Sequence, residues 1–214
     1  MKLDEQRKDR RRFEQSGTAK SRVLITISSL MATLVMVACP TIWPPSNGND
    51  GTTDPGSEPT QAILDLEEKA FDLVNDEREA AGLSRLDMDI ALRTVARQHS
   101  RDMVDRNFFD HENPDGESPF DRLDNAGIGF RMAAENIAWN NFPNPAETAV
   151  DGWMESEGHR RNILTASFSH TGMGVASNGE GGYYFTQLFV DPAKGATPAD
   201  AVVLYFEPLS IVAE

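Results

Sequence analysis

The sequence predicts an α+β fold from three observations. Apolar residues recur at helical spacing through the first part of the folded region, and strand-like runs flank a glycine-rich turn near its end. The two patterns do not alternate, and no internal repeat is present. Helices that come first and strands that come last, without a βαβ order, indicate an α+β protein.

The first two helices are predicted from apolar periodicity. Residues 61–81 carry apolar side chains at helical spacing, and Gly82 follows as a natural residue just beyond a helix end. A second helix is expected over about residues 87–106. His99 falls in its apolar stripe, so we expect a core histidine that is hydrogen-bonded to the backbone.

Two further helices are predicted downstream. Ser118 is a suitable N-cap and Pro119 suits the first helical position, which predicts a short helix over about residues 118–126. Another helix is expected over residues 146–157, with Trp153 facing inward. The segment between them, "MAAENIAW", is a short apolar run that is broken by a glutamate and an asparagine.

The last part of the folded region predicts strands. "TGMGVAS" and "YYFTQLFV" flank "NGEGG", and glycines that accept positive φ angles between two apolar runs are typical of a hairpin. "AVVLYF", residues 201–206, predicts a final strand.

The N-terminal 60 residues predict export and a lipid anchor. A basic segment precedes 16 uncharged residues, Val23–Ala38, which are too few for a comfortable membrane span. Cys39, the only cysteine, follows them as in a bacterial lipoprotein signal, although Met36 stands where leucine is usual. The alternative is an uncleaved signal anchor. Residues 39–60 contain five prolines and three glycines, which predicts a flexible tether. We therefore expect a cell-envelope lipoprotein on the outer face of a bacterial membrane or in the periplasm.

The charge distribution argues against nucleic-acid binding. Residues 1–38 contain eight basic and four acidic residues, so the rest of the chain contains 12 basic and 30 acidic residues, a net charge of −18. A surface this acidic repels phosphate backbones.

Four polar residues stand out because their neighbours are apolar or structurally constrained, and of these His170, just before a strand among Ser and Thr, is expected to face solvent. His111, Glu135 and His159 lie 24 residues apart each time. Two imidazoles and a carboxylate could hold zinc or another divalent cation, or could act as acid and base. A carboxylate inside an apolar run needs a partner, so the alternative is a structural network in which Glu135 is satisfied by a histidine or by backbone amides.

Five motifs occur in an order that resembles the CAP superfamily (cysteine-rich secretory, antigen 5 and pathogenesis-related 1 proteins, or SCP-like). They are "NFFDHENPDG", "AAENIAW", "AVDGWMESEGHRRNIL", "TGMGVA" and "YYFTQLFV". The cysteine-poor bacterial branch is the most similar. The resemblance implies an α–β–α sandwich with a central antiparallel sheet over residues 61–190. Residues 1–38 are then the signal, residues 39–60 the lipidated tether, and residues 191–214 a C-terminal extension with a final strand.

The resemblance also implies a cleft. Eukaryotic members line it with two histidines and two glutamates, a set that holds zinc in some of them. His111 and Glu135 match the first histidine and the first glutamate of that set. Ser156 stands where the second glutamate is expected, and Tyr184 stands where the second histidine is expected. Half of the set is therefore replaced, which puts permanent zinc in doubt.

In the bacterial branch, His159 of the Gly-His-Arg segment is expected to supply the missing imidazole. Asn162 and Gln187 are expected nearby as supporting residues. The basic residues Arg160 and Arg161 have a plain explanation, because cations at a helix C-terminus meet the negative end of its dipole.

The function that the resemblance implies is binding of an envelope or extracellular ligand, which could be a lipid, a cell-wall polymer or a protein. The alternative is a metal-assisted hydrolase or protease of the envelope, in which His111 and His159 hold the ion and Glu135 activates water. A purely structural module is the third interpretation. No catalytic motif is established, no cofactor is certain, and the expected partners are the membrane and an envelope component.

Overall fold

The computed structural model describes residues 59–192, 202–205 and 208–211. They belong to a compact unit that spans Asp50–Glu214. The predicted signal and Cys39 lie outside the described residues. No helix among the described residues is long and apolar enough to cross a membrane.

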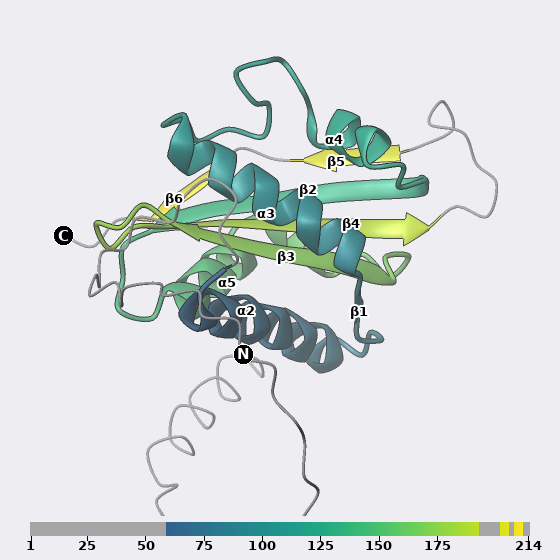
Figure 1. The fold of residues 1–214 in the computed structure, drawn as a ribbon. Helices are drawn as coiled ribbons and strands as arrows, with labels where there is room; N and C mark the ends of the chain where they lie inside the picture. The colour runs from purple at the N-terminus through teal and green to yellow at the C-terminus, as the bar shows by residue number, and fades with distance from the viewer. Residues whose placement is uncertain (1–58, 193–201, 206–207, 212–214) are drawn as a thin grey trace, which may run out of the picture. The chain divides into compact units, whose positions relative to one another are not determined.

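Figure 1 shows helices on both faces of one mixed sheet, which confirms the predicted α+β class and the three-layer sandwich. The helices are α2 (Gln61–Ala80), α3 (Ile90–Asp105), α4 (Pro119–Asn125), α5 (Pro145–Glu155) and α6 (Glu157–Ile163). The strands are β1 (Asp87–Met88), β2 (Phe130–Asn140), β3 (His170–Ser177), β4 (Tyr183–Pro192), β5 (Val202–Tyr205) and β6 (Leu209–Ile211).

The sheet has the strand order β1-β3-β4-β2-β5, and β6 also pairs with β2. Its centre is antiparallel, because β4 pairs antiparallel with both β3 and β2. The edges differ from the expected antiparallel sheet, since β1 pairs parallel with β3, and β5 and β6 pair parallel with β2. The strand predicted over residues 201–206 corresponds to β5, but it is not the last strand as expected, because β6 follows it.

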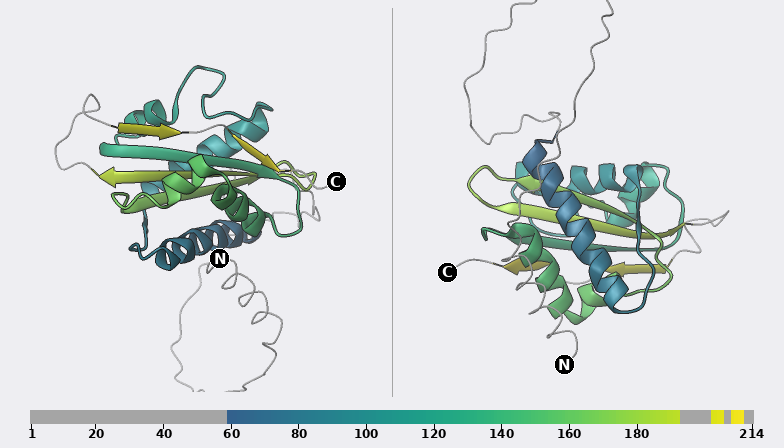
Figure 2. Two further views of the ribbon diagram at one scale, coloured as in Figure 1. Left: turned by 180° about the vertical axis from the view of Figure 1, so that it is seen from behind. Right: turned by 90° about the horizontal axis from the view of Figure 1, so that it is seen from below.

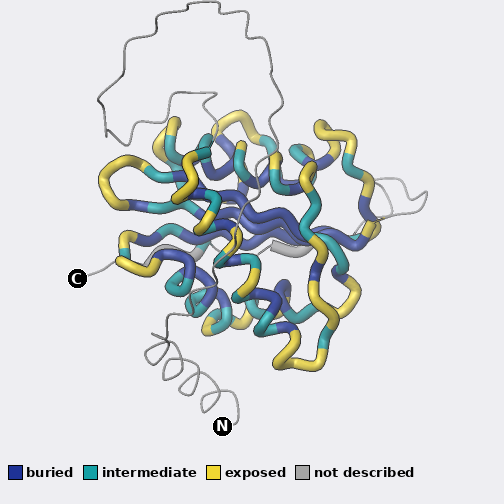
Figure 3. Tube along the Cα trace, turned by 60° about the horizontal axis from the view of Figure 1, so that its bottom comes forward, coloured by how far each residue is buried: buried dark blue, intermediate teal, exposed yellow. Residues whose placement is uncertain are grey.

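The two helical layers pack against opposite faces of the sheet (Figures 1 and 2). Side chains alternate between the faces of a strand, and β2 shows this clearly. Ala134 and Ala138 pack with residues of α2, α5 and α6 in one apolar cluster. Ala133 packs with residues of α3 and α4 in another. Figure 3 shows the central strands as the most continuously buried part of the described chain.

Most helices begin or end where the sequence predicts. Gly82 follows α2 with φ 77°, as a residue just past a helix end often does. Ser118 and Asp121 form a complete capping box at the start of α4. The second helix is shorter than predicted, because residues 87–88 form β1 and Asp89 caps α3 through its side chain.

One segment received no predicted element, and one predicted helix needs correction. The interrupted run around residues 132–139 belongs to β2, an 11-residue strand at the centre of the sheet. The helix predicted over residues 146–157 ends at Glu155, and a separate helix, α6, begins at Glu157 because Ser156 between them is extended, with φ −83° and ψ 124°. Arg160 and Arg161 therefore lie in the last turn of α6.

The glycines of "TGMGVA" allow α3 to lie directly on β3. A Cβ atom at Gly172 would collide with the backbone of Leu92, and one at Gly174 would collide with the backbone of Ala96. Ser100 fixes the same contact, because its hydroxyl group donates to the Gly174 carbonyl at 3.0 Å. This close packing holds α3 rigidly over the sheet.

A buried carboxylate joins the two helical layers at the β3 side of the sheet. Glu67 of α2 is 0% exposed and accepts two hydrogen bonds from the Arg97 guanidinium of α3, at 2.8 and 2.5 Å. It also accepts the Val175 backbone N–H of β3 at 3.3 Å. The Glu67 carboxylate therefore binds a guanidinium from α3 and a backbone amide of β3 at the same time.

Candidate functional site

Glu135, at the middle of β2, is the centre of a buried ionic cluster on the α3 side of the sheet. Its side chain is 0% exposed. His111 Nδ1 lies 2.7 Å from Glu135 Oε1, and Arg122 Nη2 donates to Glu135 Oε2 at 2.8 Å. His99 Nε2 lies 4.0 Å from the same Oε1 atom. These contacts match the alternative in which a histidine satisfies Glu135 within a structural network, and the Arg122 guanidinium also belongs to that network.

The groups that surround Glu135 decide whether this carboxylate is ionised. Burial acts to raise the pKa of Glu135, but the charge of Arg122 and the hydrogen bond with His111 outweigh burial and hold this pKa below its ordinary value. Glu135 is therefore ionised at neutral pH. An isolated buried carboxylate would be costly, so the fold depends on these partners.

Arg122 links the carboxylate to the loop that carries His111. Besides Glu135, its guanidinium donates to the His111 carbonyl at 2.9 Å and to the Glu117 carbonyl at 3.1 Å. Arg122 extends from α4, which the capping box at Ser118 starts at a fixed point. One side chain therefore positions the loop, the helix and the strand relative to one another.

His99 is a buried, neutral histidine, as its place in the apolar stripe predicts. It is 1% exposed, and its Nε2 lies 3.0 Å from the Asp110 carbonyl. Burial is the main reason that the pKa of His99 falls to about 4. A carbonyl only accepts, so Nε2 carries the hydrogen and Nδ1 is an acceptor. That Nδ1 is buried and has no hydrogen bond within the described part of the chain.

A second polar cluster surrounds His159 and the other face of β2. Ser156 Oγ lies 2.8 Å from His159 Nδ1, so the residue that replaces the family's second glutamate contacts the histidine expected to compensate for it. The Asn136 side chain donates to the His159 carbonyl at 3.2 Å. Asn162 donates to Asn136 Oδ1 at 2.8 Å and to the Glu135 carbonyl at 3.3 Å. Asn162 therefore anchors α6 to β2.

The structure brings together some of the predicted cleft residues and separates others. His111 and Glu135 are in direct contact. The helix that carries His159 packs on the face of β2 that bears Asn136, which is opposite to the face of the Glu135 side chain. Tyr184 makes edge contacts with Phe109 and Trp139, and Gln187 donates to Thr171 Oγ1 at 3.2 Å.

The residues of the Glu135 cluster do not suit a resident metal ion in this arrangement. Among the described residues, no three His, Cys, Asp or Glu side chains form a group that could hold one. Both oxygens of Glu135 are engaged, one by His111 and the other by Arg122. The guanidinium already supplies a positive charge beside the carboxylate. A zinc site at His111, Glu135 and His159 stays a prediction that these contacts do not favour.

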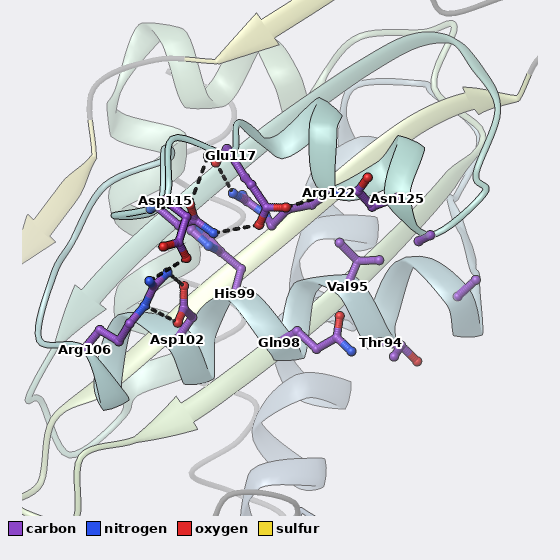
Figure 4. Close-up of a pocket in the computed structure, with 13 residues that line it drawn as sticks. Thr94, Val95, Gln98, His99, Asp102, Arg106, Asp115, Glu117, Arg122 and Asn125 are labelled. Carbon is purple, nitrogen blue, oxygen red and sulfur yellow. Dashed lines mark hydrogen bonds and ion pairs between the residues drawn. The ribbon is translucent and has the colours of Figure 1, made fainter.

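An open groove of about 950 Å³ lies next to the Glu135 cluster (Figure 4). α3 forms one wall, and the loop after it, together with α4, forms the other. His99 and Arg122 line it, so the groove reaches the groups that contact Glu135. The six residues predicted for a cleft, His111, Glu135, Ser156, His159, Tyr184 and Gln187, are not among its lining residues. A cleft over those six residues stays a prediction.

Sequence reasoning missed Arg122 entirely. The available signal was weak but real: a buried glutamate needs a cation, and Arg122 sits between the buried Pro119 and Leu123 in a short helix. His99 was expected as a core residue, and the structure adds that it lines a groove beside Glu135.

The three-layer sandwich, with a buried acid–histidine–arginine cluster beside an open groove, defines an SCP-like domain. The sequence profile of CAP, the cysteine-rich secretory protein family, matches residues 71–189, and the chain belongs to this family. The uncharacterized protein YkwD of Bacillus subtilis is 41% identical over 142 residues, which cover 66% of this chain and 51% of that protein. The uncharacterized membrane protein YlbC of the same species is 40% identical over 124 residues, which cover 58% of this chain and 34% of that protein.

Solved structures agree with this assignment. An extracellular protein containing an SCP domain from Bacillus anthracis superposes with a TM-score of 0.55 and 35% identity, over 63% of this chain and 45% of that one. An outer surface protein from Borrelia burgdorferi has a TM-score of 0.55 at 17% identity, over 60% of this chain and 94% of that one, which shows the shared fold alone. The chain spans about half or less of the Bacillus relatives that it matches.

Proposed function

We propose that this chain is an exported, lipid-anchored CAP-domain protein that binds a component of the cell envelope. The groove between α3 and α4 carries the proposal. It is open to solvent, and both of its walls are fixed by contacts within the described residues. α3 is held on β3 through Gly174 and Ser100, and α4 is tied to β2 by Arg122. A groove with rigid walls is a suitable binding site because little order has to be gained on binding.

The lining favours a polar ligand. Besides two alanines and Val95, the groove is lined by polar or charged residues, among them Gln98, Asp102 and Asn125. Sites for lipids or sterols are predominantly apolar. This composition supports a cell-wall polymer or a peptide segment over a lipid or sterol.

Export and anchoring are supported by the N-terminal sequence and by the relatives. The basic segment, the apolar run and Cys39 resemble a lipoprotein signal. A similar protein from Bacillus anthracis is described as extracellular, and a relative from Bacillus subtilis as a membrane protein. Both descriptions are consistent with a domain that works at the envelope.

The groove is tested with envelope fragments. Because relatives come from Bacillus subtilis, fragments of its envelope are incubated with the full chain, and the bound fraction is measured. Gln98→Trp places a large side chain on the α3 wall of the groove, and we expect binding to fall at least about tenfold. Glu68→Trp is the matched control on an exposed position of α2, at the other face of the sheet. Equal binding by the parent chain and both variants would argue against the groove.

The anchor is tested separately from the groove. Cys39→Ala removes the residue that the lipid would modify, so the variant should move from the membrane fraction to the soluble fraction. The same variant should still bind envelope fragments in solution. Unchanged membrane retention of Cys39→Ala would refute the lipid anchor and leave the groove untouched.

A further inference from the structure

The hydrogen-bond donors of the groove's two arginines are mostly engaged inside the protein. Arg106 donates to both carboxylate oxygens of Asp102, at 2.7 and 2.6 Å, and to Asp115 at 2.6 Å. The two terminal nitrogens of Arg122 donate to Glu135 and to two backbone carbonyls. Among the nitrogen atoms of these two guanidinium groups, only Arg122 Nε has no hydrogen bond with a described residue, and this atom is buried. The guanidinium groups therefore offer little to an incoming anion.

Two side chains of the groove, Glu117 and Thr94, offer hydrogen-bond acceptors to a ligand. The Glu117 carboxylate accepts the side-chain amides of Asn113 and Asn125, both at 2.9 Å, and forms no ion pair with a described residue. These two bonds hold it on the groove wall, where Figure 4 shows it opposite α3. The Thr94 hydroxyl donates to a backbone carbonyl at 2.9 Å, so it faces a ligand as an acceptor. His99, a lining residue, has a further acceptor in its Nδ1 atom, which is buried and has no hydrogen bond with a described residue.

The lining also contains more acidic than basic residues. Its acidic residues are Asp102, Asp115 and Glu117, and its basic residues are Arg106 and Arg122. The charge of Arg122 is matched by Glu135, which lies below the groove and not in its lining. His99 is neutral. The groove therefore attracts cations and repels anionic polymers.

From these contacts we propose that the groove binds its ligand through a primary ammonium group that pairs with Glu117. This inference rests on the proposed function and names the ligand chemistry of that site. An ammonium group has three donors and no acceptor, which matches a lining whose guanidinium groups are engaged within the protein and whose Glu117 carboxylate can accept further hydrogen bonds. Such a group can belong to a lysine side chain in a peptide or to an amino sugar, and the experiment distinguishes the two sources.

The test measures binding of small probes to the immobilised full chain by surface plasmon resonance. The peptide probes are acetyl-Gly-Lys-Gly-amide, the same peptide acetylated on the lysine nitrogen, and the corresponding glutamate peptide. The sugar probes are glucosamine and N-acetylglucosamine. We expect at least one amine probe to bind, with acetylation of its nitrogen weakening binding about tenfold, because a charge-assisted hydrogen bond is lost. Binding should also weaken as salt is raised.

A matched pair of variants assigns the effect to one carboxylate. Glu117→Gln keeps the shape and loses the charge, so it should weaken the amine probe about tenfold. Glu180→Gln makes the same change in the exposed hairpin turn, outside the groove lining, and should have no effect. If the lysine peptide binds, the ammonium group of the ligand belongs to a peptide. If glucosamine binds and the lysine peptide does not, it belongs to an amino sugar.

The proposal is overturned if acetylation leaves binding unchanged, if the glutamate peptide binds more tightly, if Glu117→Gln binds like the parent chain, or if no amine probe binds. Each of these results leaves the Gln98→Trp assay with envelope fragments intact. Loss of fragment binding in that assay would then mean that the groove is used by a ligand of different chemistry.

Discussion

Replacing Arg122 with methionine removes the cation that faces the buried carboxylate of Glu135. The two groups are 2.8 Å apart, and their side chains are 9% and 0% exposed. Breaking a buried pair on one side costs about 3–5 kcal/mol, because a charge is left without its partner. His111 still contacts Glu135, so we expect about 3 kcal/mol. For a domain of this size that lowers the melting temperature by roughly 6–12 °C.

The assay is urea unfolding of the full chain, followed by tryptophan fluorescence, with two comparison variants. Arg131→Met breaks an ion pair with Asp191 in which the arginine is 67% exposed, and should cost less than about 1 kcal/mol. Arg122→Met combined with Glu135→Gln removes both charges and should recover part of the lost stability. The deficit of the single variant should also depend on pH, in a direction that follows from the pKa of Glu135.

In the parent chain the pKa of Glu135 lies below its ordinary value of 4.5, so its contribution to stability is present above that value and is lost as pH falls through the folded pKa. Without Arg122, burial raises the pKa of Glu135. The variant carboxylate then takes up a proton more readily in the folded state, and the stability deficit narrows as pH is lowered from about 8 toward 5. A deficit below about 1 kcal/mol, or no recovery in the double variant, would refute the buried ion pair as a major stabilising contact.

Three further predictions concern single residues. The pKa of His99 drops from 6.5 to about 4 on folding, so only the unfolded state takes up the proton between these pH values. The free energy of unfolding should therefore fall by roughly 3 kcal/mol as pH is lowered from about 6.5 to 4. In pH-dependent melts, His99→Gln should make stability less dependent on pH over this range. Gly174→Ala should cost about 1–3 kcal/mol in urea unfolding, since the new methyl group meets the backbone of Ala96, whereas a neutral result would show that α3 can move away from β3. Glu67→Gln should cost about 1–3 kcal/mol, because the buried amide no longer carries the charge that pairs with the partly exposed Arg97 guanidinium, and a loss under about 0.5 kcal/mol would contradict that role.

Local signals in the sequence were sufficient for most helices. Apolar spacing predicted both ends of α2, with Gly82 marking the second, and Ser118 predicted the start of α4. These positions were accurate within a few residues because such signals act over one or two helical turns. β2 was missed for a physical reason. It is buried on both faces, so it lacks the alternating pattern of a half-exposed strand, and the buried residues Glu135 and Asn136 interrupt the apolar run.

The site was harder to predict because its partners are distant in sequence. The contact of His111 with Glu135 spans 24 residues and was proposed from chemistry, through the need of a buried carboxylate for a partner. The contribution of Arg122 depends on how α4 packs on β2, which no local pattern encodes. The position of α6 could not be predicted from local patterns either. Glu135 and Asn136 point to opposite faces of β2, and α6 covers the face that bears Asn136.

The measurement that tests the groove most directly is photo-crosslinking from within it. A photoreactive benzoylphenylalanine replaces Gln98 on the groove wall in the full chain, and in a control it replaces Glu68 on the opposite helical layer. Both proteins are irradiated with envelope fragments, and crosslinked envelope material is quantified. Binding in the groove predicts a strong adduct from position 98 and little from position 68. Equal adducts from both positions, or none from position 98 while the protein remains bound, would contradict it.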